Sequence, residues 1–252
     1  MSKRVLYTAL GVAACITLIL MSLSHVVAQT VEGGYKIFRP EGPGPHPAVV
    51  FLSGCSGFTP SFAPKHYELV AEQFRTKGYV VVFADYLGRR GLTDCHGFRI
   101  SEAAGDLVAA ATWLKSQPFI DTGRITAIGW SFGGGAVLLA LNAYSIEQLI
   151  FTRAIVYYPM CQDPPSKVPV LMLLGGEDNV VRNKSCQEVA KKSDIPEAVK
   201  IVIYPGAHHG FDRSELPPKM DYASPVFGTL GYHPQAAAAA WEEVQRFLQP
   251  TK

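Results

Sequence analysis

The chain has 252 residues, of which 48% are hydrophobic and 17% are charged. This length and composition fit one globular domain with a well-filled core. The formal net charge is only +2 and no basic run occurs, so we expect no nucleic-acid partner.

The first 28 residues are predicted to lie outside the fold. An apolar run over 5–23 follows two basic residues, and small residues continue to Ala28. This pattern is typical of a secretory signal peptide cleaved after Ala28. We therefore expect a signal peptide over 1–28 and one domain over 29–252, in a secreted or periplasmic protein. Because the apolar run is also long enough to span a membrane, an uncleaved anchor is the alternative.

Short apolar runs alternate with helical patterns along the rest of the chain. The predicted strands cover 35–38, 48–52, 79–83, 125–128, 154–158, 168–174 and 200–204. Predicted helices cover 64–76, a stretch capped by Ser101 that ends near 116, a stretch after the 125–128 strand, 183–192 and 236–248. This order predicts an α/β fold, with a mostly parallel sheet and helices on both faces. Ligands bind beyond the carboxyl ends of such strands, so the loops there are the ones to search.

A nucleophile elbow is predicted at Gly129-Trp130-Ser131-Phe132-Gly133, between a strand and an apolar helical stretch. The glycines let strand and helix pass closely while the Ser131 hydroxyl projects from a strained turn. The Phe132 N–H then opens the helix and is a candidate oxyanion donor. The loop after the 48–52 strand offers a second donor, the Cys55 N–H.

A base and an orienting acid are expected in later loops, in the order serine, acid, histidine. The acid candidates are Glu177 and Asp178, and the base candidates are the adjacent His208 and His209. Each pair follows a predicted strand, and the residues alone do not choose within either pair.

The remaining motifs point away from metals and cofactors. We predict no metal site, because the His, Cys, Asp and Glu spacing fits none, and no cofactor, because no glycine-rich phosphate loop occurs. The histidines at 46, 66, 96 and 233 are expected to be structural or solvated. Signal removal would leave four cysteines, at 55, 95, 161 and 186, in an oxidising compartment.

The chain resembles the dienelactone hydrolase family of α/β-hydrolases from about Tyr35 to Leu248. The elbow, Gly175-Gly176-Glu177-Asp178, the segment 204–211 and the closing helix carry the resemblance. It implies that the acid is Asp178 and that the base is His209, directly before Gly-Phe. The sheet order of that fold also implies the disulfide pairs Cys55–Cys95 and Cys161–Cys186.

Two departures from the family matter for the chemistry. The founding enzyme has cysteine where this chain has Ser131, and a glutamate where this chain has Gly54. Its thiol mechanism therefore cannot apply here. The family also binds a substrate carboxylate with two arginines, and Arg89 or Arg90 and Arg213 lie at similar positions; the alternative is solvated surface arginines.

These patterns predict a serine hydrolase that cleaves carboxylic esters or lactones through an acyl-enzyme, with a small-molecule substrate and no membrane contact beyond an uncleaved anchor. A serine peptidase of the same fold and a non-catalytic binding protein are the alternatives.

Overall fold

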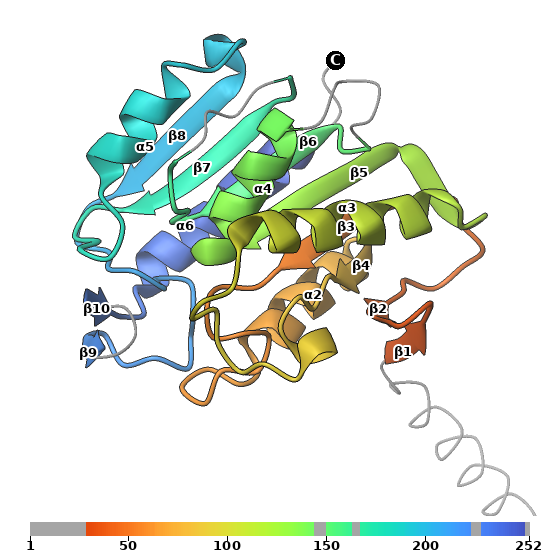
Figure 1. The fold of residues 1–252 in the computed structure, drawn as a ribbon, viewed down its shortest axis with the longest axis horizontal. Helices are drawn as coiled ribbons and strands as arrows, with labels where there is room; N and C mark the ends of the chain where they lie inside the picture. Colours follow the sequence, from red (N-terminus) through yellow and green to blue (C-terminus); the bar gives the residue numbers. More distant parts are fainter. Residues whose placement is uncertain (1–28, 144–149, 163–166, 223–227, 250–252) are drawn as a thin grey trace, which may run out of the picture.

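Eight strands form the main sheet of the computed structural model, which describes residues 29–143, 150–162, 167–222 and 228–249 (Figure 1). The sheet order is β1-β2-β4-β3-β5-β6-β7-β8. The strands are β1 (Gln29–Glu32), β2 (Tyr35–Phe38), β3 (His46–Leu52), β4 (Val80–Phe83), β5 (Ile120–Trp130), β6 (Arg153–Tyr157), β7 (Val170–Gly175) and β8 (Val199–Tyr204). The strands from β4 to β8 in this order pair in parallel, and β1 and β2 add an antiparallel edge.

Helices cover both faces of the sheet. They are α2 (His66–Thr76), α3 (Ile100–Lys115), α4 (Phe132–Ala143), α5 (Asn183–Ala190) and α6 (Pro234–Leu248). One core cluster joins α3, α4 and α5 to one face, and a second joins α2 and α6 to the other. Figure 1 shows α3 and α4 in front of the sheet and α6 behind it. The predicted mostly parallel α/β fold is therefore confirmed.

The parallel register aligns the carboxyl ends of the central strands. Leu52 in β3 pairs with Gly129 in β5, and Trp130 pairs with Tyr157 in β6. Further along the sheet, Gly175 at the end of β7 pairs with Tyr204 at the end of β8. The loops after β3, β5, β6, β7 and β8 therefore begin at one edge, and this edge carries the candidate site.

Some predicted bounds differ from the structure. The helix expected to be capped by Ser101 begins at Ile100, with Arg99 at the cap position and no side-chain cap bond, so the predicted cap is wrong. An extended Arg99 suffices to start α3, because the buried alanines and leucines of its inner face stabilise it by packing. The short pair β9 (Met220–Tyr222) and β10 (Gly228–Leu230) lies in a stretch for which the sequence predicts no strand.

The predicted signal peptide over 1–28 lies outside the described residues. Among the residues that are described, no helix has the length and apolar character needed to cross a membrane.

Candidate active site

The turn between β5 and α4 presents Ser131 in a strained conformation. Its φ is 51°, in the left-handed region that residues with side chains rarely adopt. A Cβ on Gly129 would lie 2.5 Å from the carbonyl oxygen of Gly133, and one on Gly133 would lie 2.3 Å from that of Ser53. Only glycine permits these approaches, so both glycines of the pentapeptide are required by packing.

The Ser131 hydroxyl faces the His209 imidazole, whose other ring nitrogen contacts the Asp178 carboxylate. Ser131 Oγ lies 3.0 Å from His209 Nε2, and His209 Nδ1 lies 2.8 Å from Asp178 Oδ2. The other carboxylate oxygen, Asp178 Oδ1, accepts the backbone N–H groups of Val180 and Val181, each at 2.9 Å. The side chains of His209 and Asp178 are 8% and 1% exposed. Shielded from water, this arrangement can pass a proton from the serine to the imidazole.

Glu177 and His208, the other candidates for the acid and the base, are not part of this arrangement. Glu177 is exposed, and its carbonyl oxygen lies 3.1 Å from His208 Nδ1. The structure therefore brings together Ser131, His209 and Asp178, and not His208 or Glu177.

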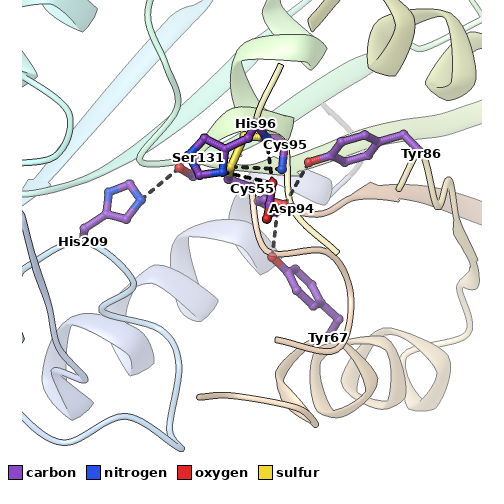
Figure 2. The surroundings of a disulfide bond; sticks show 9 residues. Cys55, Tyr67, Tyr86, Asp94, Cys95, His96, Ser131 and His209 are labelled. Carbon is purple, nitrogen blue, oxygen red and sulfur yellow. Dashed lines mark hydrogen bonds and ion pairs between the residues drawn. A yellow bond between two sulfur atoms is a disulfide. The ribbon is translucent and has the colours of Figure 1, made fainter. Parts of the chain in front are cut away.

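The loop after β3 is fixed by two buried tyrosines. The Gly54 N–H donates to the Tyr67 hydroxyl, and the Tyr86 hydroxyl donates to the Gly54 carbonyl oxygen, both at 2.9 Å. The Gly54 N–H is therefore engaged, and the next amide along the loop belongs to Cys55, the residue predicted to supply the second oxyanion donor. Figure 2 shows this loop beside Ser131 and His209.

Both cysteine pairs in the described residues form disulfides. Cys55 bonds to Cys95, in the segment between β4 and α3, and Cys161, after β6, bonds to Cys186 in α5. The Cys55–Cys95 disulfide lies in the loop after β3, whereas Cys161–Cys186 ties the loop after β6 to a helix.

Ser131, His209 and Arg213 are among the residues that line a cavity of about 40 Å³. Arg213 Nη2 donates to the Tyr67 hydroxyl at 3.1 Å, while Arg213 Nε is buried without a hydrogen-bond partner. Burial opposes the charge, but Tyr67, Tyr158 and Asp212 outweigh it and raise the pKa of Arg213. Arg213 therefore brings a positive charge to the wall of this cavity.

The other two predicted arginines do not line this cavity. Arg89 lies against Tyr35, with its Nη1 3.4 Å from the tyrosine hydroxyl. Arg90 donates to Asp106 at 2.5 Å and to the Tyr86 carbonyl oxygen at 2.8 Å. Both belong to the short helical turn after β4, which faces α3 and β2, so neither reaches Ser131 in this structure.

A larger hollow of about 570 Å³ lies between α2 and α6. Neither Ser131 nor His209 lines it, so the reacting groups place the candidate site in the smaller cavity. Within the described parts of the chain, no cluster of three His, Cys, Asp or Glu residues is arranged to hold a metal ion.

Sequence reasoning missed the polar residues behind the site. Tyr67 and Tyr86 hold the loop after β3, and Tyr158 packs against His209 and donates to Asp212. The sequence around them carries no distinctive signal. The tyrosines cannot be told from ordinary core residues, and Asp212 cannot be told from an ordinary loop carboxylate. Only its position three residues after His209 could have drawn attention to Asp212.

The strand–serine–helix turn, with a histidine and an acid from later loops of one parallel sheet, defines an α/β-hydrolase fold. The chain belongs to the dienelactone hydrolase family, whose model matches residues 34–252.

Individual relatives agree with this family. A carboxymethylenebutenolidase of Pseudomonas putida is 28% identical over 160 residues, which cover 61% of this chain and 59% of the relative. The match thus spans about three-fifths of that relative. A dienelactone hydrolase structure from Anabaena variabilis has a TM-score of 0.59 at 22% identity, and covers 84% of this chain and 89% of its own. Esterase 2 of Thermogutta terrifontis, phosphorylated by paraoxon, has a TM-score of 0.58 at 18% identity, and covers 88% and 94%.

Proposed function

We propose that this protein is a serine hydrolase that cleaves carboxylic esters or lactones. The observation that carries the proposal is the chain of contacts from Ser131 Oγ to His209 Nε2 at 3.0 Å and from His209 Nδ1 to Asp178 at 2.8 Å. Such a chain activates a hydroxyl that is otherwise a weak nucleophile at neutral pH. Membership of the dienelactone hydrolase family supports the same class of reaction.

In the proposed reaction, Ser131 Oγ attacks the carbonyl carbon while its proton passes to His209 Nε2. The Phe132 and Cys55 N–H groups receive the oxyanion, and Asp178 stabilises the imidazolium. The tetrahedral intermediate collapses by breaking the carbon–oxygen bond of the leaving group, which takes the proton from His209. Water then attacks the acyl-enzyme with the same proton transfers, releasing the acid and restoring Ser131.

The substrate is proposed to carry a negative charge near its reacting carbonyl. Support comes from Arg213, which lines the cavity beside Ser131 and whose positive charge is maintained there. A substrate carboxylate beside this guanidinium would form a charge-assisted hydrogen bond. Arg89 and Arg90 are not assigned a role in this pocket.

We further propose that the mature chain begins at Gln29, folds as one domain and works outside the cytoplasm. The signal-like pattern of residues 1–28 supports export. The two disulfides support it too, because such bonds persist in oxidising compartments.

The first test compares the mature chain with Ser131→Ala on p-nitrophenyl acetate, p-nitrophenyl butyrate and a five-membered lactone. Turnover should fall at least about a thousandfold in the variant. Ser101→Ala, on the exposed face of α3, is the matched serine control and should retain wild-type rates. A fluorophosphonate probe should label the wild type and not Ser131→Ala. A folded wild type that neither turns over these substrates nor takes the label would favour a non-catalytic binding protein.

A further inference from the structure

A second buried carboxylate, Asp212, is connected to His209 through Tyr158. Its side chain is 10% exposed, and both of its oxygens are engaged. Oδ1 accepts the Tyr158 hydroxyl at 2.6 Å, and Oδ2 accepts the indole N–H of Trp130 at 2.8 Å. His66 Nε2 lies 3.4 Å from Oδ2, within ion-pair distance. None of these contacts is part of the chain of contacts from Ser131 through His209 to Asp178.

Tyr158 connects this carboxylate to the imidazole. The ring centroids of Tyr158 and His209 are 4.4 Å apart, so the phenol packs directly against the base. Tyr158 has a φ of 37°, an unfavourable conformation for a tyrosine, and its N–H donates to the Leu173 carbonyl oxygen at 2.8 Å. Fixed at its backbone and at its hydroxyl, the ring has little freedom to move away from His209.

Trp130 connects the same carboxylate to the nucleophile. It is the residue directly before Ser131, and its ring is fully buried at the carboxyl end of β5. The bond from its indole N–H to Asp212 therefore links the loop that carries His209 to the strand that presents Ser131. One carboxylate thus holds a neighbour of each reacting group.

The charge on Asp212 is maintained despite its burial. Burial alone would raise the pKa of this carboxyl, but His66, the Tyr158 hydroxyl and Arg213 together lower it to about 2. Burial also raises the pKa of Tyr158 well above its usual value, so this hydroxyl stays protonated and donates. At neutral pH the network is therefore a carboxylate that accepts from a neutral phenol.

We propose that Asp212 is a positioning residue for the hydrolysis reaction. It acts through Tyr158 and Trp130 to hold the His209 imidazole against Ser131, and its charge favours the protonated imidazole that forms during acylation. This inference rests on the proposed function, because it assumes that His209 is the base.

Several other groups also act on His209 or on this carboxylate. Asp178 contacts the imidazole from the loop after β7, and Ser131 contacts it from the elbow. Arg213, next in sequence to Asp212, places a positive charge at the cavity that Ser131 and His209 line. His66 and Tyr67 of α2 contact Asp212 and Arg213 respectively. Asp212 thus opposes Arg213, and removing it leaves that positive charge near the imidazole uncompensated.

Asp212→Asn keeps the shape of the side chain and removes its charge. On p-nitrophenyl butyrate we expect kcat to fall about tenfold, the equivalent of one hydrogen bond to a charged group, with KM unchanged. The acid limb of kcat/KM should move to lower pH, because the imidazolium loses a favourable charge. Asp106→Asn, which breaks a surface pair with Arg90, is the matched control and should change neither. A fall in kcat with an unmoved acid limb would mean that Asp212 is only structural, and would overturn the proposal.

Tyr158→Phe provides a second test that does not depend on the folding of Asp212→Asn. It keeps the ring against His209 and the charge on Asp212, and removes the hydroxyl that donates to Asp212. We expect a severalfold loss of kcat, an unchanged KM and an unmoved acid limb. Tyr204→Phe is the control, since Tyr204 packs on Phe211 and its hydroxyl is buried without a hydrogen-bond partner. Equal kcat values in the two variants would overturn the positioning role.

Histidine NMR separates this proposal from the proposed function. In protein labelled with nitrogen-15 at histidine, the His209 signals are assigned with His209→Asn and followed against pH. The imidazole should lose its proton at a lower pH in Asp212→Asn than in the wild type, whether or not any ester is turned over. Identical titration curves would refute the proposal even if the wild type proves to be an esterase.

Discussion

Cys95 and Cys55 are joined twice. Their sulfur atoms form a disulfide, and the Cys95 N–H donates to the Cys55 carbonyl oxygen at 2.9 Å. The N–H of the same Cys55 is the proposed oxyanion donor. Cys95 therefore holds the residue that carries this donor, while Tyr67 and Tyr86 hold the preceding residue, Gly54. The two disulfides should therefore differ in what they do for catalysis.

Replacing Cys55 and Cys95 with serine should lower kcat about tenfold or more, because the donor loses part of its support. Replacing Cys161 and Cys186 with serine should leave kcat within about twofold. Each change should cost about 3–4 kcal/mol of stability, from the loop lengths that the bonds close. Ester kinetics and urea denaturation on both double variants measure the two effects. Equal kcat losses would show that the Cys55–Cys95 bond has no special relation to the oxyanion.

Asp178→Asn should reduce kcat about a thousandfold or more, because the amide no longer stabilises the imidazolium or selects its tautomer. Glu177→Gln changes the adjacent exposed carboxylate in the same way and should have no effect. Steady-state kinetics on p-nitrophenyl butyrate compare the two. A larger loss in Glu177→Gln would reassign the acid.

Arg213→Met should selectively impair anionic substrates. We expect kcat/KM for p-nitrophenyl hemisuccinate to fall about tenfold or more relative to p-nitrophenyl butyrate, because a charge-assisted hydrogen bond is lost. Arg89→Met removes an arginine outside the cavity and should leave the ratio of the two substrates unchanged. A parallel loss on both esters would mean that Arg213 supports the loop rather than the substrate.

Asp212 should make stability depend on pH in the acid range. Its pKa is about 2 in the folded chain and about 3.9 in an unfolded one, so its contribution is complete above about pH 4 and is lost as the pH falls through 2. Between pH 5 and pH 3 the wild type should lose about 1 kcal/mol more unfolding free energy than Asp212→Asn. Urea denaturation at the two pH values tests this, and equal losses would contradict it.

Gly133→Ala should prevent stable folding, because its Cβ would lie 2.3 Å from the Ser53 carbonyl oxygen in fixed backbone. Gly105→Ala in α3 meets no atom within 4 Å and should stabilise the chain by about 0.5–1 kcal/mol. Thermal unfolding of the two alanine variants makes the comparison. A soluble, active Gly133→Ala would show that the elbow can relax.

Much of the fold and the reacting residues could be predicted because each leaves a local pattern. Buried strands leave apolar runs, and a serine between two glycines after such a run indicates an elbow. The choice of His209 over His208 came from family resemblance, since adjacent residues share every local signal. Asp212 was missed for a different reason. Its burial depends on Trp130 and Tyr158, which lie 82 and 54 residues away in sequence, so only the assembled tertiary structure reveals its partners.

The small volume beside Ser131 has a consequence for substrate choice. A space of about 40 Å³ is far smaller than the roughly 150 Å³ that accommodates a benzene ring, so only the atoms next to a reacting carbonyl fit inside it. Most of an ester of the proposed kind would then extend into solvent. Bulky groups next to the carbonyl carbon should be disfavoured, while distant parts of the substrate make few contacts with this cavity.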